Sequence, residues 1–185
     1  SLPSSGSISL FNHSYAQPKV IRPFIGFVPQ ELSIFEELSV EENMKFFSKL
    51  SWKPRSMEEC HALCTQMQLT EWKKQAAKLS GGTKRKLNLA ISLIHDPKLL
   101  LLDEPTVGID MRSKEEIGKY LYALAKEQQK MILLTSHDLH EIASYCDRVL
   151  LIGSDPYYAK TLKTLYPHLP IENLTDIVDM QLAQT

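Results

Sequence analysis

Four short apolar segments constrain the fold of this chain more than any other feature of its sequence. They read FIGFV (24–28), LLLL (99–102), MILLT (131–135) and RVLLI (148–152). None of them alternates apolar with polar residues, as a strand with one solvent-exposed face would. Unbroken apolar runs of this length are typical of strands that are buried on both faces of a parallel sheet. Helical patterns separate the last three runs, so the sequence predicts β–α–β units and an α/β fold.

Helix starts are marked by a Ser or Asp that is followed three residues later by Glu, a pattern known as the capping box. Such pairs occur at Ser39/Glu42, Ser56/Glu59, Ser113/Glu116 and Asp138/Glu141. The segment from about 39 to 95 has helical patterns throughout, which predicts an all-helical insert in the α/β frame. The predicted domains are a core of 1–38 and 96–155, a helical subdomain of 39–95, and a C-terminal extension of 156–185 that includes a short helix over 171–184.

Composition and charge exclude several classes of protein. Lys and Arg total 21 against 22 for Asp and Glu, so no global field favours nucleic acid or anionic lipid. The apolar runs are far shorter than the roughly 20 residues that a membrane-spanning helix needs.

Cys60 and Cys64 flank His61 and invite a metal interpretation. We favour an apolar helix face made of Cys60, Leu63, Cys64 and Met67, because closed zinc sites need four ligands. A reduced, cytosolic compartment is expected.

Polar side chains follow three of the apolar runs. Gln30 comes two residues after FIGFV, Asp103 and Glu104 follow LLLL directly, and His137 comes two residues after MILLT. The carboxyl ends of parallel strands meet at one edge of a sheet, where ligands bind. We therefore expect an amide, two carboxylates and an imidazole to share that edge.

These groups suit phosphoryl transfer. Asp103 can hold Mg²⁺ through water, and Glu104 can polarise an attacking water molecule. Gln30 can sense the magnesium or the water, and His137 can bond an oxygen of the γ-phosphate. Each residue alone has an ordinary explanation, such as a polar loop, a solvated turn or a helix cap. Their joint placement after consecutive strands favours the functional interpretation.

A turn with two glycines opens a basic helix in LSGGTKRKLNLA (79–90). We call Ser80, Gly81 and Gly82 the glycine turn, and Lys84, Arg85 and Lys86 the basic triplet. Ser80 is expected to cap the helix, which leaves free N–H groups at its start. Each cation in those first turns is disfavoured by the helix dipole by about 0.3–1 kcal/mol. The triplet therefore predicts an anion at this end of the helix; the alternative is a solvated basic surface.

Five motifs in this order and spacing resemble the nucleotide-binding domain of an ABC transporter. LSGGTKRKL resembles the ABC signature, LLLLDEP the Walker B motif, GFVPQ the Q-loop, TVGID the D-loop, and LLTSHD the switch-histidine strand. The match runs from about Ser5 to Ile152, and GGTKRKL is more similar to the drug- and lipid-exporter branch. The resemblance implies a P-loop NTPase-like (RecA-like), mostly parallel sheet with an inserted helical subdomain.

The resemblance also implies a mechanism that uses ATP and Mg²⁺. Two such domains dock head to tail around two ATP molecules and drive a transmembrane permease. The implied roles are Gln30 and Asp103 at the metal, Glu104 as the catalytic base, His137 on the γ-phosphate, Ser80, Gly81 and Gly82 on the ATP of the second domain, and Asp110 as the link between the two sites. The helical insert and Glu31–Glu37 would receive the permease. The protein would lie on the cytoplasmic face of a membrane, with no nucleic acid partner.

Two segments depart from the family pattern. The Walker A motif, GxxxxGK[ST], occurs nowhere in these 185 residues and would precede them, so we expect this chain alone to bind ATP weakly and not to hydrolyse it. After RVLLI, the segment GSDPYYAKTLKTLYPHLP has no counterpart with an assigned role.

Two other functions are open at this point. A non-transport ABC ATPase that acts on ribosomes or DNA would show tandem domains or long coiled coils, and neither occurs in this chain. A non-catalytic ABC-like interaction module would have no need to retain Glu104 and His137.

Overall fold

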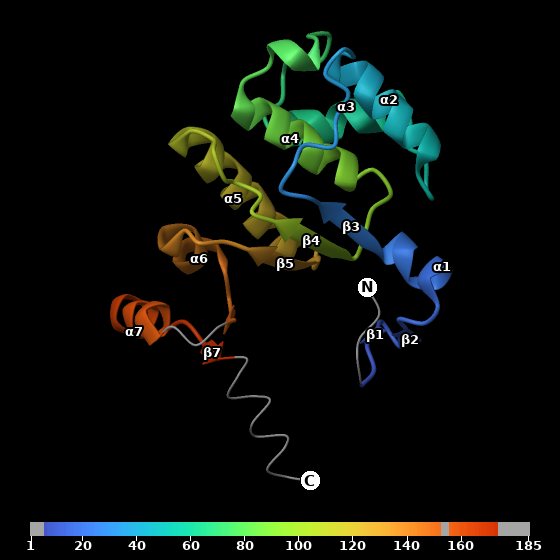
Figure 1. Ribbon diagram of the computed structural model, residues 1–185. Helices are drawn as coiled ribbons and strands as arrows, with labels where there is room; N and C mark the ends of the chain where they lie inside the picture. Colours follow the sequence, from blue (N-terminus) through green and yellow to red (C-terminus); the bar gives the residue numbers. More distant parts are fainter. Residues whose placement is uncertain (1–5, 153–155, 174–185) are drawn as a thin grey trace. The chain divides into compact units, whose positions relative to one another are not determined.

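The computed structural model describes residues 6–152 and 156–173, which fall into two compact units (Figure 1). The first unit comprises Ser1–Thr135 and the second comprises Ser136–Thr185. Each unit has its own sheet and its own apolar core. The predicted domain boundaries stay a prediction.

The first unit is built on a three-stranded parallel sheet in the order β3-β4-β5. The strands are β3 (Ile25–Val28), β4 (Leu99–Asp103) and β5 (Met131–Thr135), which lie side by side in Figure 1. Their register aligns Val28 with Leu102 and Leu102 with Leu134. Three of the apolar runs are therefore parallel strands, and the predicted α/β class is confirmed.

Helices fill the segment between β3 and β4. They are α2 (Val40–Leu50), α3 (Met57–Gln66), the 3-10 helix η2 (Ala76–Lys78) and α4 (Gly81–Ser92). Ser39 and Ser56 form the predicted capping boxes with Glu42 and Glu59. Ser80 caps α4 as predicted, because its side chain accepts a hydrogen bond from the Thr83 amide. The local capping signals thus determine where these helices begin.

The helix between β4 and β5 begins earlier than the sequence pattern predicts. Helix α5 spans Met111–Glu127 and is capped by Asp110, so the expectation that Ser113 caps it is wrong. Both residue types are good caps. The Asp110 carboxylate accepts a hydrogen bond from the Ser113 amide at 3.0 Å, so Asp110 is the N-cap and Ser113 lies inside the helix.

One apolar core joins the helical insert to the sheet. The Cys60–Met67 face of α3 is buried, with Cys60 and Cys64 at 0% exposure and Met67 at 3%. It belongs to the same cluster as Leu87 of α4, Leu100 of β4 and Leu121 of α5. The insert is therefore packed into the first unit and has no separate core.

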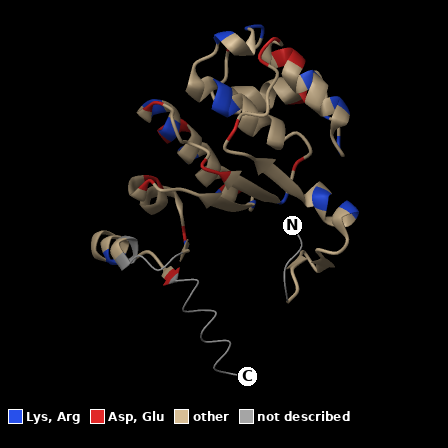
Figure 2. Cartoon of the chain, viewed as in Figure 1, with Lys and Arg blue, Asp and Glu red and all other residues tan. Residues whose placement is uncertain are grey.

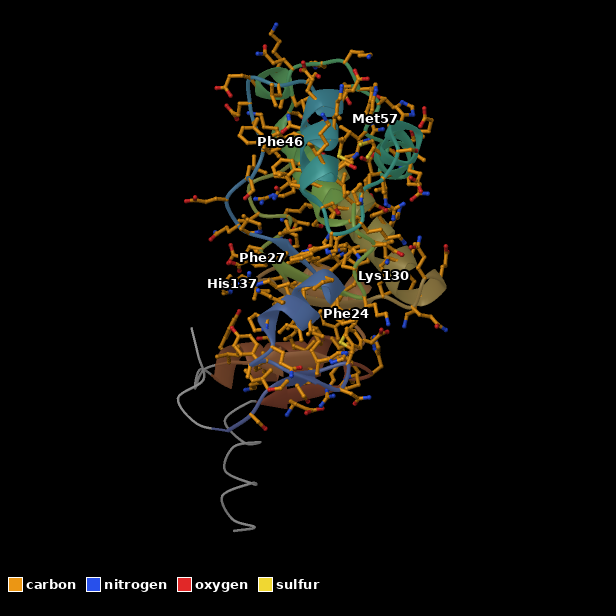
Figure 3. All side chains as sticks on the ribbon, turned by 90° about the vertical axis from the view of Figure 1, so that its right-hand side faces the viewer. Phe24, Phe27, Phe46, Met57, Lys130 and His137 are labelled. Atoms are coloured by element: carbon orange, nitrogen blue, oxygen red, sulfur yellow. The ribbon has the colours of Figure 1, made fainter. Side chains whose placement is uncertain are left out.

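The sheet is covered on one face, which differs from the predicted burial on both faces. Gly26 lies against α4, since a Cβ there would be 2.7 Å from the Ser92 carbonyl oxygen. Side chains alternate along a strand, so Val28 shares this covered face and is 1% exposed. The opposite face carries Phe27 and Leu133, which are 59% and 56% exposed (Figure 3 labels Phe27). An apolar run alone therefore did not reveal that, among the described residues of the first unit, nothing covers this face.

A small hairpin and helix precede β3. The hairpin consists of β1 (Ser9–Leu10) and β2 (His13–Ser14), and it leads into α1 (Pro18–Ile21) and the 3-10 helix η1 (Arg22–Phe24). Phe11 and Asn12 turn the hairpin with φ values of 48° and 64°. The Lys98 ammonium lies 5.2 Å from the centre of the Phe24 ring, which attaches this segment to the start of β4.

The second unit contains α6 (Leu139–Tyr145), β6 (Val149–Leu151), α7 (Pro156–Leu165) and β7 (Ile171–Asn173). Strand β6 pairs in parallel with β7 around a core of Val149, Leu162 and Leu169. The segment without an assigned counterpart thus forms α7. The helix expected over 171–184 is wrong at 171–173, which is a strand, and the rest of it lies outside the described residues.

Candidate functional site

Four residues form a hydrogen-bonded chain at the carboxyl ends of the three parallel strands. The Gln30 side-chain amide donates to Glu104 Oε2 at 3.0 Å, across 74 residues of sequence. The Thr135 hydroxyl donates to Asp103 Oδ1 at 2.7 Å and accepts from the Glu104 amide at 3.0 Å. We call Gln30, Asp103, Glu104 and Thr135 the strand-end rim. The structure therefore brings together three of the predicted site residues, and it adds Thr135, which the sequence did not single out.

The backbone at Glu104 is left-handed, with φ at 45°. Outside glycine this conformation is uncommon and costs about 1–2 kcal/mol. Non-glycine residues in such conformations cluster at functional sites, where the surrounding structure holds them in place. The bond from the Glu104 amide to Thr135 is one such restraint. The rim thus contains a glutamate whose backbone is strained.

The oxygen atoms of the rim fit a magnesium ion. Asp103 is exposed, and one of its carboxylate oxygens is the acceptor of the Thr135 bond. Mg²⁺ prefers oxygen ligands and is usually bound through one or two carboxylates together with waters and substrate phosphates. Within the described residues, no three Asp, Glu, His or Cys side chains gather as a metal-binding group.

His137 lies in the second unit, two residues after Thr135 in the sequence. Its imidazole is exposed, and the next residue, Asp138, caps α6 by accepting from the His140 and Glu141 amides. The predicted cap at Asp138 is therefore present, and the role of His137 on a phosphate stays a prediction.

The glycine turn packs against the start of α5. A Cβ on Gly82 would be 2.1 Å from Ser113 Oγ and 2.4 Å from its Cβ, so no side chain fits there. At Gly81 the same atom would be 3.8 Å from Ile109, which is ordinary contact. Gly82 is buried, whereas Ser80 and Gly81 are exposed. The second glycine is therefore required by packing within the chain.

Asp110 is occupied in capping α5. Its carboxylate accepts from the Ser113 amide and, at 2.7 Å, from the Ser113 hydroxyl. These hydrogen bonds lower the pKa of the Asp110 carboxyl. The cap explains the residue type, and the predicted role as a link between two sites stays a prediction.

All three cations of the basic triplet have partners within the chain. Figure 2 colours the basic positions of the chain blue and the acidic positions red. Lys84 bonds Glu36 at 2.5 Å and Lys86 bonds Glu116 at 2.5 Å. Arg85 donates to the carbonyl oxygen of Gln30 at 2.7 Å and to that of Pro29 at 3.3 Å. These internal partners offset the unfavourable dipole, so the triplet needs no docked anion to explain it, and the alternative of a solvated basic surface is wrong because Arg85 and Lys86 are each 6% exposed. An anion at the start of α4 stays a prediction.

Comparison with known proteins identifies the family. A model described as "ABC transporter" matches residues 1–107, which is more than half of the 185-residue chain. The chain belongs to the ABC transporter family. A model for an AAA domain also matches residues 73–143 of this ABC transporter family member.

Curated ABC relatives match over most of this chain. ABC transporter A family member 8 of Dictyostelium discoideum is 36% identical over 158 residues, which are 82% of this chain and 18% of that protein. The linearmycin resistance ATP-binding protein LnrL of Bacillus subtilis (strain 168) is 35% identical over 147 residues, 76% of this chain and 46% of that protein. The chain therefore spans less than half the length of these relatives.

Solved ABC cassettes share the fold. The dimeric, post-hydrolysis ATP-binding cassette MJ0796, bound to ADP and Pi, has a TM-score of 0.66 and 22% identity over 76% of this chain and 66% of that one. The structure of cbiO1 from Clostridium perfringens, part of the ABC transporter complex cbiONQ, has a TM-score of 0.68 and 30% identity over 78% of this chain and 61% of that one. The fold is thus that of an ABC ATPase cassette, as predicted. No helix within 6–152 or 156–173 is both long and apolar enough to cross a bilayer.

Proposed function

We propose that this chain contributes the strand-end half of an ATP-hydrolysing site in an ABC transporter. The observation that carries the proposal is the hydrogen bond from Gln30 to Glu104. It sets an amide beside the carboxylate of a residue with a strained backbone, where parallel strands end. Phosphoryl transfer depends on positioning and electrostatic stabilisation more than on covalent chemistry by the protein. A restrained carboxylate and an amide at a ligand-binding edge supply both.

Each group of the rim has a role in the proposed reaction. Glu104 accepts a proton from the attacking water, and Gln30 orients that carboxylate and senses the metal. Asp103 holds Mg²⁺ through water, with Thr135 orienting the Asp103 carboxylate. When bound with ATP, Mg²⁺ would neutralise charge on the phosphate oxygens. His137, in the second unit, bonds a γ-phosphate oxygen in this proposal.

A second nucleotide-binding domain completes the proposed site. The exposed Ser80 and Gly81, with the N–H groups at the start of α4, contact ATP held by that domain. Gly82 lies against Ser113 and Asp110, and in this proposal Asp110 links the two sites. The dimeric state of the solved cassette that holds ADP and phosphate supports this arrangement.

A transmembrane permease docks beside α2 in this proposal. Phe35 and Phe46 are 42% and 41% exposed, and their rings contact each other at 4.8 Å (Figure 3 labels Phe46). Exposed apolar clusters of this kind mark interaction sites. The neighbouring Glu31 and Glu37, both exposed, favour an apolar partner segment with basic flanks. Such docking places the chain peripherally on the cytoplasmic face of a membrane.

The test measures ATP turnover by the product of the complete reading frame. We expect Glu104→Gln to lower turnover by about 100-fold or more, the effect of losing a general base. It should also convert the protein into an ATP-bound dimer, which light scattering would detect. Glu115→Gln, which changes an exposed carboxylate on α5, is the matched control. Equal turnover by Glu104→Gln and wild type would contradict the proposal.

The 185-residue chain itself is a second test. We propose that its turnover is negligible beside that of the complete product, because it contains no GxxxxGK[ST] pattern. Comparable turnover by the two would show that the chain grips ATP phosphates by another route.

A further inference from the structure

Arg85 is a buried cation whose hydrogen-bond acceptors, among the described residues, are main-chain carbonyl oxygens and not carboxylates. The residue is 6% exposed, and its guanidinium donates to the main-chain carbonyl oxygens of Gln30 at 2.7 Å and Pro29 at 3.3 Å. Burial lowers the pKa of this guanidinium. A buried charge is tolerated only where hydrogen bonds compensate for lost water. The two carbonyls are thus bound by charge-assisted bonds, which are stronger than neutral ones.

This contact connects the start of α4 to the strand-end rim. Gln30 accepts from Arg85 through its main chain and donates to Glu104 through its side chain at 3.0 Å. Arg85 lies about one helical turn beyond Gly81. A single residue, Gln30, therefore separates the helix of the glycine turn from the carboxylate of the proposed base.

The neighbouring cations do not share this arrangement. Lys84 and Lys86 instead bond the carboxylates of Glu36 and Glu116. A planar guanidinium can present separate N–H groups to two acceptors, whereas an ammonium is a flexible point charge. Arginine at this position therefore suits the holding of two successive carbonyls.

We propose that Arg85 is a positioning residue for Gln30. It fixes the main chain at 29–30 so that the Gln30 amide stays against Glu104, and it transmits movement of the glycine turn to that carboxylate. The proposal rests on the proposed function of the rim. Physical coupling of this kind requires contiguous contacts, which the bonds from Arg85 to Gln30 and from Gln30 to Glu104 provide.

A double-mutant cycle in the product of the complete reading frame tests this role. Arg85→Met keeps an unbranched apolar stem and removes the charge. We expect it to lower kcat about tenfold with KM for ATP within about twofold, the size of losing a charged hydrogen bond. If Arg85 acts through Gln30, Gln30→Ala should lower kcat similarly and the double variant should fall no further. Arg85→Lys should restore about a third of wild-type kcat, since one carbonyl stays in reach.

Two outcomes would overturn the proposal. One is multiplicative losses in the double variant, because independent residues act additively in free energy. The other is an equal loss from Lys84→Gln, the matched control, which removes a cation from the same turn and should change kcat by less than about twofold.

A readout that needs no catalysis separates this proposal from the proposed function. Amide hydrogen exchange in the 185-residue chain should be about tenfold faster over residues 29–34 in Arg85→Met and unchanged over α3, because local opening becomes easier. Unchanged exchange over 29–34 would overturn the positioning role. If the wild-type product and its Glu104→Gln variant hydrolyse ATP equally, the proposed function fails, whatever the exchange result.

Discussion

The strand-end rim and the first turns of α4 are both rich in polar side chains, but they use them in opposite ways. Gln30, Asp103 and Thr135 are exposed; Gln30 bonds Glu104 and Thr135 bonds Asp103, so their remaining hydrogen-bonding groups face solvent. Arg85 and Lys86 are each 6% exposed and bond other parts of the chain. Substitution in the rim should therefore change chemistry with little loss of stability, whereas substitution in α4 should cost stability first.

The largest expected effect on stability comes from Gly82→Ala. The added methyl would lie 2.1 Å from Ser113 Oγ, and overpacking of this kind costs about 1–3 kcal/mol. Urea unfolding followed by the fluorescence of Trp52 and Trp72, both in the first unit, measures the loss. Adding Ser113→Gly removes both close contacts and should recover part of the stability. Gly81→Ala is the control, because its nearest neighbour is at 3.8 Å.

Glu116→Gln should cost about 1–2 kcal/mol at neutral pH, because Lys86 would lose its charged partner. Hydrogen bonds from Lys86 and then Arg112 lower the pKa of Glu116 below its ordinary value of 4.5. Its ion pairs therefore stabilise the fold above that pH, and this stabilisation is lost as the pH falls through the lowered pKa. Unfolding midpoints of wild type and variant should converge in acid. A difference that is constant from neutral pH to below 4 would contradict this origin.

Thr135→Val tests the exposed rim. The valine keeps the shape of threonine and removes the hydroxyl that bonds Asp103 and the Glu104 amide, so we expect a loss of about 0.5–1 kcal/mol. Thr135→Ser, which retains the hydroxyl, should lie within about 0.5 kcal/mol of wild type. A loss as large as that of Gly82→Ala would remove the contrast between the two regions.

Glu104→Gly should give the smallest change and the opposite sign. Glycine adopts the positive φ of 45° without steric strain, so the variant should gain about 0.5 kcal/mol in unfolding free energy while losing ATP turnover. Glu104→Ala removes the same carboxylate without relieving the backbone, so it separates the two effects. Equal stability of the glycine and alanine variants would show that Glu104 carries no strain.

Local signals in the sequence predicted the framework and three members of the rim. The capping boxes at Ser39 and Ser56 depend on residues three apart in the sequence. The apolar runs predict the strands, and the polar residues that follow two of these runs are Gln30, Asp103 and Glu104. Thr135 was missed because its bond to Asp103 depends on the register between β4 and β5. The signal that could have found it is a polar residue at the end of one strand when the neighbouring strand ends in a carboxylate residue.

The partners of the basic triplet could not be read from the sequence. Lys86 and Glu116 are 30 residues apart, and Arg85 and Gln30 are 55 residues apart, so only the packing of α4 brings them together. The uncovered face of Phe27 and Leu133 was missed for a related reason. An apolar run predicts a strand, but the number of faces that helices cover depends on the tertiary fold.

The positions of the three cysteines allow the unfolding of each unit to be followed by thiol labelling. Cys60 and Cys64 are fully buried in the core of the first unit, and Cys146 belongs to the second. Burial raises the pKa of Cys64 to about 12 and that of Cys146 to about 11, so each thiol reacts slowly while its unit is folded. Pulses of a thiol-alkylating reagent, read by mass, would then time the opening of each unit separately, without an introduced label.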